Sequence, residues 1–211
     1  MDKEAATLSQ EHASLWRTGG FPKRHRESLR GLGLRWEEAA AYFAEVPGEQ
    51  AKRAAQGLYA GAPVLLLGGH GTGKTTLATY FAWADGQRHA RAGNAWSCRY
   101  TTTRQYLDDL RAGYESGSTA GKTSAYESRL LVLDEVDAGL EGASEWARKE
   151  IESLLDYRYG QSLPHILIGN SHAKRFAELL GPAASDRLRQ GLTYIPCTWE
   201  SYRHVGSDLP S

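Results

Sequence analysis

A glycine-rich octapeptide that ends in lysine and threonine is the clearest chemical signal in this 211-residue sequence. The segment Gly68–Thr75 matches the pattern G-x-x-x-x-G-K-[ST] at every fixed position. Glycines let successive backbone N–H groups point at phosphate oxygens, and a following helix adds its positive end. The lysine then contacts the β- and γ-phosphates, and the last hydroxyl binds Mg²⁺. The pattern predicts an ATP and Mg²⁺ site, with nucleotide contacts from Gly68, Gly69, His70, Gly71, Thr72, Gly73, Lys74, Thr75 and Thr76.

Two carboxylates follow a second apolar run, Leu130–Leu133, downstream of this loop. In a parallel sheet the strands point their carboxyl ends at the ligand, so both acids belong at that edge. Asp134 is expected to hold Mg²⁺ together with Thr75, and Glu135 to orient and deprotonate a water that attacks the γ-phosphate. An acidic turn after a strand is also common by chance, but the upstream phosphate loop favours the catalytic interpretation.

Further polar residues follow later in the chain. Asn170 ends the run that begins at Ile166, and its amide could hold the attacking water or touch the γ-phosphate. The alternative is an ordinary asparagine turn. Arg187 and Arg189 follow a Gly-Pro turn, and either could enter a neighbouring subunit's ATP site to stabilise transition-state charge. The alternative there is a surface salt bridge with the adjacent Asp186.

These residues need a scaffold of short buried strands that alternate with helices, which predicts an α/β fold with a parallel sheet. Apolar runs predict strands at 63–67, 98–102, 130–133, 165–168 and near 192–197. Helical patterns cover 75–84, 105–110, 144–159 and 173–180, with a loop rich in Gly, Ser and Thr at 113–124. Residues 35–60 also show helical spacing. Residues 1–20 are expected to form a short extension, and 21–211 one ATP-binding domain.

Composition limits the remaining function classes. The 25 basic and 25 acidic side chains cancel, so any nucleic-acid surface must be a local patch. No apolar run approaches the roughly 18 residues of a membrane span, and the first ten residues contain no apolar signal core. The two cysteines, Cys98 and Cys197, are expected to be buried thiols. These features together favour a cytoplasmic protein without a membrane partner.

The motifs resemble, in order and spacing, those of the AAA+ ATPases, and more narrowly the DnaC/IstB branch of helicase loaders and transposition helper ATPases. The resemblance is carried by Gly68–Thr75, Leu130–Glu135, Asn170 and Asp186–Arg189. It is sharpened by the entry segment Phe21–Arg24, the helix end Leu155–Tyr159 and the terminal motif Trp199–Arg203. It covers residues 21 to about 205.

The resemblance implies an AAA+ core whose ATP sites lie between subunits of an ATP-dependent homo-oligomer. Lys74 and Thr75 would form Walker A, Asp134 and Glu135 Walker B, and Asn170 sensor 1, with Arg187 as the arginine finger and Arg189 as the alternative. It also implies that residues 104–128 grip single-stranded DNA; they include Arg104, Tyr106, Arg111, Tyr114 and Lys122. The alternative for that segment is a solvated helix with core tyrosines.

One departure from the branch bears on function. Only about 20 residues precede the expected core, where loaders usually carry a domain that grips the replicative helicase. No C-terminal lid domain is expected, which differs from the wider AAA+ class but fits the DnaC/IstB pattern. The leading hypothesis is a DnaC-like helicase loader that hydrolyses ATP in DNA replication. An IstB-like transposition helper is the alternative. An ATP-gated interaction module with little hydrolysis is disfavoured by Glu135, and no substrate motif supports a small-molecule kinase.

Overall fold

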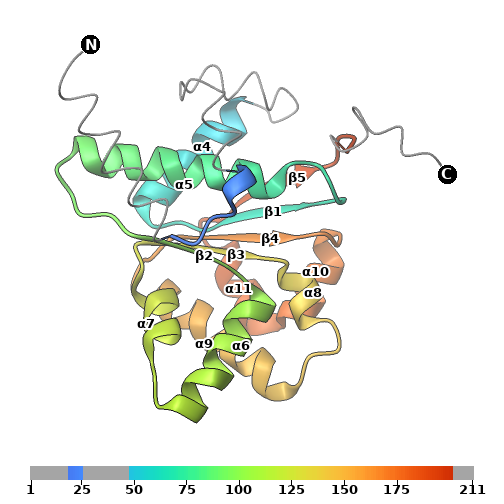
Figure 1. Ribbon diagram of the computed structural model, residues 1–211. Helices are drawn as coiled ribbons and strands as arrows, with labels where there is room; N and C mark the ends of the chain where they lie inside the picture. The colour runs from blue at the N-terminus through green and yellow to red at the C-terminus, as the bar shows by residue number, and fades with distance from the viewer. Residues whose placement is uncertain (1–18, 26–47, 202–211) are drawn as a thin grey trace, which may run out of the picture.

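The computed structural model describes residues 19–25 and 48–201 of the chain. Its centre is one sheet of five parallel strands in the order β2-β3-β4-β1-β5 (Figure 1). The predicted parallel α/β fold is therefore confirmed, and each strand begins within one residue of its predicted start. The strands are β1 Val64–Gly68, β2 Cys98–Thr102, β3 Leu130–Asp134, β4 His165–Gly169 and β5 Thr193–Cys197.

Helices cover both faces of the sheet (Figure 1). One face carries α4 Gly48–Ala60 and α5 Lys74–Arg91. The other carries α6 Thr103–Ser116, α7 Ala120–Glu127, α8 Val136–Leu140, α9 Glu145–Gly160, α10 Ala173–Leu180 and α11 Pro182–Arg189. Two apolar cores result, one on each side of the sheet, because alternate residues of β1, β3 and β4 point to opposite faces. Among the described helices, none combines the length and apolarity needed to cross a bilayer.

The helical layer on the second face is more complete than the sequence indicated. The prediction of a loop at 113–124 is wrong, because α6 continues to Ser116 and α7 begins at Ala120. Helix α5 also runs past its predicted end to Arg91, through Gly86. The ring of Trp96 packs so closely there that a Cβ on Gly86 would lie 3.2 Å from it. Tertiary packing thus compensates for the low helix propensity of this glycine.

A buried arginine on α9 joins the amino-terminal ends of the central strands. Arg158 is fully buried, and its guanidinium donates to five backbone carbonyls, those of Ala125, Tyr126, Ser128, Arg129 and Pro164. Burial lowers the pKa of Arg158 to about 10, so it keeps its charge at neutral pH. The contacts connect the end of α7 to the starts of β3 and β4, which holds these two strands in register.

Several predicted features lie outside the described residues. They are residues 1–18 of the expected extension, the part of the helical pattern at 35–60 that precedes Gly48, and the end of the terminal motif at Tyr202 and Arg203. The predicted domain boundary at residue 20 therefore stays a prediction.

Candidate functional site

The carboxyl ends of β1, β3 and β4 meet at one edge of the sheet, around a cavity of about 340 Å³. Most of the residues that the sequence singled out converge on this cavity. The exceptions among the predicted loop contacts are Gly68, Gly69 and Thr72, which do not line it. The lining consists of Pro22, Arg24, His25, His70, Gly71, Gly73, Lys74, Thr75, Thr76, Tyr100, Asp134, Glu135 and Asn170.

The loop between β1 and α5 takes the curled shape that its glycines allow. Gly71 and Gly73 have φ values of 82° and 81°, a region that side chains disfavour. Gly68 is needed for another reason: β5 approaches so closely that a Cβ on Gly68 would lie 2.0 Å from the Cys197 carbonyl oxygen. The loop leads directly into α5, and the first three residues of that helix, Lys74, Thr75 and Thr76, line the cavity. The first turn of a helix carries backbone N–H groups without helical partners, which is where an anion binds.

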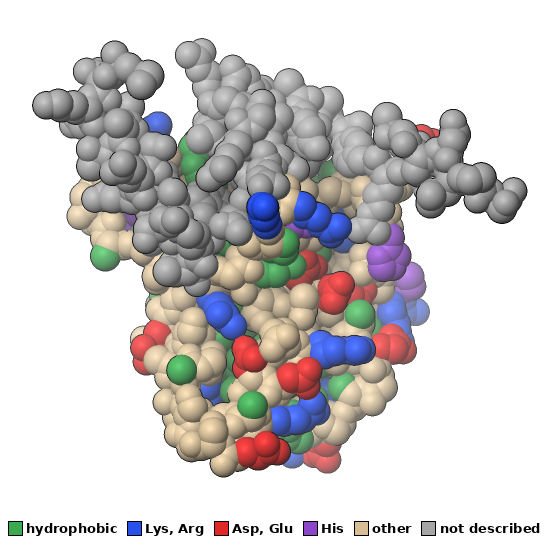
Figure 2. All heavy atoms as spheres, viewed as in Figure 1, with side chains coloured by type: hydrophobic (Ala, Val, Ile, Leu, Met, Phe, Trp, Pro, Cys, Tyr) green, Lys and Arg blue, Asp and Glu red, His purple; other side chains and the backbone are tan. Residues whose placement is uncertain are grey.

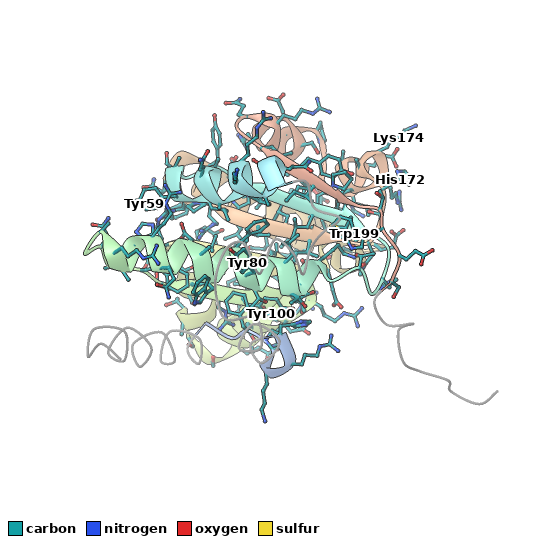
Figure 3. The ribbon with its side chains drawn as sticks, turned by 90° about the horizontal axis from the view of Figure 1, so that it is seen from above. Tyr59, Tyr80, Tyr100, His172, Lys174 and Trp199 are labelled. Carbon is teal, nitrogen blue, oxygen red and sulfur yellow. The ribbon has the colours of Figure 1, made fainter. Side chains whose placement is uncertain are left out.

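The ammonium group of Lys74 lies within this loop and is almost buried, with 6% of the residue exposed. It donates to the carbonyl oxygens of Gly68 and Gly69 at 2.7 and 2.6 Å, and lies 3.3 Å from the Thr72 hydroxyl. On the far side of the loop, the indole N–H of Trp199 donates to the Thr72 carbonyl at 2.9 Å. Trp199, which the sequence offered only as part of a family motif, thus supports the loop from the segment that follows β5 (Figure 3).

A hydroxyl and a carboxylate from different elements come together in the cavity. The Thr75 Oγ1–H donates to Asp134 Oδ2 at 2.8 Å, which confirms that these two predicted metal ligands lie side by side. The Tyr100 hydroxyl on β2 donates to the same oxygen at 2.8 Å. Burial, followed by the charge of Asp134, raises the pKa of Tyr100, so its phenol stays protonated and remains a donor.

Glu135 lines the cavity and has an unusual backbone conformation. Its φ and ψ of 55° and 40° are left-handed, and its backbone N–H donates to Asp134 Oδ1 at 2.8 Å. Such a conformation costs a non-glycine residue about 1–2 kcal/mol. A strained residue beside a ligand cavity is typical of a functional position. The geometry therefore separates the roles of the two acids, with Asp134 at the hydroxyl of α5 and Glu135 at the cavity wall.

Asn170 lies at the end of β4 and lines the same cavity. The backbone N–H groups of Asn170 and Ser171 both donate to Asp137 Oδ2, at 2.6 and 2.5 Å. Asp137 belongs to α8 and is buried, with 6% of the residue exposed. It thereby ties the tip that carries Asn170 to the helix that follows Glu135. Asp137 belongs to no motif that the sequence analysis recognised, although it follows Glu135 by only two positions.

The two candidate finger arginines lie away from this cavity and on different sides of α11. Arg187 forms an ion pair with Asp156 on α9, not with the adjacent Asp186 that the sequence suggested as partner. It lines a separate cavity of about 210 Å³ with Pro63 and His165, at the amino-terminal ends of β1 and β4. Arg189 lines an open groove between α10 and α11 instead.

The segment predicted to grip DNA is helical, and its candidate residues differ in exposure and in ion pairing. Tyr106 is buried in the core and is not available to a base. Tyr114 is 60% exposed, while Arg111 pairs with Asp108 and Lys122 with Glu150. Figure 2 shows Lys and Arg side chains interspersed with Asp and Glu over the lower helices of this face. On the described residues of this face, basic and acidic side chains are therefore mixed.

Arg104 is the exception in this segment, because it lies near the nucleotide cavity. It lines a neighbouring cavity of about 310 Å³ at the start of α6, together with Gln105, Asp108 and Glu135. Glu135 thus forms part of both cavities.

Comparison with known proteins agrees with this geometry. The sequence is 32% identical over 75 residues to the replicative helicase loader DnaC of Escherichia coli K12, which covers 35% of this chain and 30% of the relative. A crystal structure of the DnaC helicase loader matches 70% of this chain and 87% of that one, with a TM-score of 0.57 and 22% identity. The replication initiator DnaA bound to AMPPCP and single-stranded DNA matches 70% of this chain and 44% of that one, with a TM-score of 0.53 and 20% identity.

The two structural matches establish the AAA+ P-loop fold. The family assignment rests on a different comparison, which covers well over half of the sequence. The model of the IstB-like ATP-binding proteins matches residues 58–207, from the end of α4 past the terminal tryptophan. This match contains the phosphate loop, both acids after β3, Asn170 and both arginines of α11. The chain therefore belongs to the IstB-like ATP-binding protein family.

Proposed function

We propose that this protein hydrolyses ATP at the interface between two copies of itself and uses the cycle to act on DNA. The observation that carries the proposal is the convergence of Thr75, Asp134, Glu135 and Asn170 on the cavity beside the phosphate loop. A module that only binds ATP has no need of a carboxylate held in a strained conformation at that wall. The position of Glu135 therefore favours hydrolysis.

The residues present fit a magnesium ion. Mg²⁺ prefers oxygen ligands and usually keeps several waters, so that one or two protein oxygens and the phosphates complete its shell. The Thr75 hydroxyl and Asp134 carboxylate supply two such oxygens, and the described residues contain no cluster of three or more acidic, His or Cys side chains that would suit a different metal. When bound, the ion would neutralise charge that develops on the phosphates.

Each of the side chains at the cavity would have a separate role in hydrolysis. Lys74 would exchange its loop carbonyls for phosphate oxygens, since its ammonium already lies within the loop. Glu135 would accept a proton from the attacking water, and the Asn170 amide would hold that water or the γ-phosphate. Asp137 is a positioning residue in this scheme, because its carboxylate accepts from backbone N–H groups, those at the tip of β4 and that of Ala138.

Arg187 can complete such a site only in a neighbouring copy. It lies beside Pro63 and His165, at the starts of β1 and β4, whereas the phosphate loop follows the end of β1. Four residue steps along β1 span roughly 13 Å, at about 3.3 Å each, which exceeds the reach of an arginine side chain. An arginine finger at this position therefore acts in trans and requires a homo-oligomer.

Among DNA-directed roles, we favour a DnaC-like helicase loader in replication. The curated relative is a replicative helicase loader, and the structural relatives are replication proteins, one of them bound to single-stranded DNA. The matched segment spans less than a third of the curated relative, so helicase binding and the cytoplasmic setting belong to the proposal. The family description favours the IstB-like transposition helper as a second candidate.

Steady-state ATPase assays with and without single-stranded DNA test the proposal. Glu135→Gln should bind ATP as tightly as wild type but lower kcat by about 100-fold or more, because the general base is lost while the shape is kept. Glu141→Gln, at the exposed end of α8, is the matched control and should behave as wild type. Equal rates for wild type and Glu135→Gln would leave only a nucleotide-gated binding module.

A further inference from the structure

The segment Gly19–His25, here called the strap, runs from the sheet edge to the phosphate loop. The backbone N–H of Tyr100 donates to the Gly19 carbonyl at 2.6 Å. The Phe21 ring is buried, and its centroid lies 5.3 Å from that of Tyr100. Figure 3 shows Tyr100 beside the short helical turn of the strap. The backbone and Phe21 thus fix the strap in place, independently of its charged side chains.

The strap ends in a chain of hydrogen bonds that reaches α5. Arg24 Nε lies 3.1 Å from His25 Nε2, and His25 Nδ1 lies 2.8 Å from Thr76 Oγ1. The Nε of an arginine is always a donor, so His25 Nε2 must accept. The imidazole proton is therefore on Nδ1, from which it is donated to the Thr76 oxygen. The tautomer of His25 is in this way set by its neighbour in sequence.

This chain of bonds decides what the Thr76 hydroxyl can do. Because Thr76 Oγ1 accepts a proton from His25, its own O–H remains a donor that can serve another acceptor. Thr79, one turn further along α5, differs, since its hydroxyl donates at 2.6 Å to the Thr75 carbonyl of its own helix. Thr76 lines the nucleotide cavity together with Arg24 and His25. Its donor therefore belongs to the site.

We propose that Arg24 and His25 orient Thr76 so that its hydroxyl donates to the phosphate chain of a bound nucleoside di- or triphosphate. The inference rests on the nucleotide site proposed above. Thr76 is already an expected nucleotide contact, and the inference adds the two strap residues that orient its hydroxyl. The contact is separate from that of Thr75, whose hydroxyl faces Asp134. Thr76 lies one residue further along α5, whereas it is Thr75 whose hydroxyl reaches Asp134, where the metal and the γ-phosphate are proposed to bind. The contact therefore goes to phosphates that ATP and ADP share.

Equilibrium titration with fluorescent ATP and ADP analogues tests this subsite. His25→Leu should weaken both nucleotides roughly tenfold, the size expected for a hydrogen bond to a charged group. His25→Asn keeps an N–H near the position of Nδ1 and should stay within about threefold of wild type. Thr76→Val should match His25→Leu, and the double variant should lose no more than either one. Lys23→Leu removes a strap cation that does not line the cavity and should leave affinity unchanged.

The outcomes separate this inference from the proposed function. If wild type binds neither nucleotide, the nucleotide site itself fails. If wild type binds and His25→Leu binds equally well, only the strap subsite is overturned. A loss confined to ATP would also overturn it, because the contact would then go to the γ-phosphate. Equal losses in His25→Leu and His25→Asn, with a lowered Tm in both, would show that His25 acts on stability alone.

Discussion

Asp137 shows how one side chain can matter for hydrolysis without facing the substrate. Its carboxylate accepts from two backbone N–H groups at the tip of β4 and from Ala138 at the start of α8. Hydrogen bonds to a buried charge are worth about 1.5–3 kcal/mol each. The carboxylate therefore fixes the position of Asn170 relative to Glu135, which precedes Asp137 by two residues.

Replacing this anchor should separate catalysis from binding. Asp137→Ala should lower kcat about tenfold or more while changing ATP affinity less than threefold, because Lys74 and the phosphate loop are not touched. Glu141→Ala removes the acid at the other end of α8, which is exposed and pairs with Arg175, and should leave kcat unchanged. Single-turnover assays at saturating ATP measure the effect. A variant that binds ATP tenfold worse at an unchanged kcat would contradict this role.

At the residue scale, the sequence identified the groups that have a fixed chemical pattern and missed those defined by packing. Asp134 and Asn170 each follow an apolar run, so their place at the sheet edge could be predicted. Tyr100 and Asp137 reach the site through the order of the strands, because β2 pairs with β3 and α8 lies beside the end of β4. That order is not visible in a single sequence, and neither residue carries a local signal.

At the element scale, the strands were predictable and several helices were not. Four or five consecutive apolar residues closed by glycine or acid are a strong strand signal, and β1, β3 and β4 are accordingly buried along their length. Helix α8 has only five residues, which is too short for a periodic pattern. Helix α11 buries only Ala184 and Leu188, whereas α10, which is equally long and was predicted, buries three large apolar side chains. Helix α7 is rich in small and polar residues, and Ala125 is the buried residue that docks it.

The start of β4 provides a pH-dependent test of packing. His165 is buried, with 4% of the residue exposed, and its Nε2 has no hydrogen-bond partner. Burial and then the charge of Arg158 lower the pKa of His165 from 6.5 to about 3. At a pH between these two pKa values, His165 is protonated in the unfolded chain but neutral in the folded protein. The unfolding free energy should therefore fall as pH falls below 6.5, by up to about 1.4 kcal/mol per pH unit from this group.

Denaturant unfolding at pH 7.0, 6.0 and 5.0 measures this slope. His165→Leu should give a shallower decline than wild type, because the group that titrates only in the unfolded chain is gone. His89 also has a lowered pKa through burial, so the difference between variant and wild type is the informative quantity. His172→Asn removes an exposed histidine but keeps the acceptor that caps α10, and it serves as the matched control. Parallel slopes for wild type and His165→Leu would show that His165 titrates normally.

At the scale of the whole molecule, the sheet separates the two halves of the proposed active site. The phosphate loop, Asp134, Glu135 and Asn170 lie at the carboxyl ends of the strands. Arg187 lies beside their amino-terminal ends, paired with Asp156. One copy can therefore present an ATP site to one neighbour and an arginine to the other, which is a head-to-tail arrangement. Such an interface closes into a ring or continues as a filament.

Mixing two inactive variants tests this arrangement directly. Arg187→Ala should bind ATP but lose its stimulated hydrolysis, by a factor of about 1,000 or more for a true finger. Lys74→Ala should lose ATP binding but still present Arg187. In a random equimolar mixture, roughly a quarter of head-to-tail interfaces pair an intact ATP site with an intact arginine, so activity should partly return. Arg189→Ala, from the opposite side of α11, should stay active alone; if it is inactive and complemented instead, the finger is Arg189. A mixture as inactive as its components would refute action in trans.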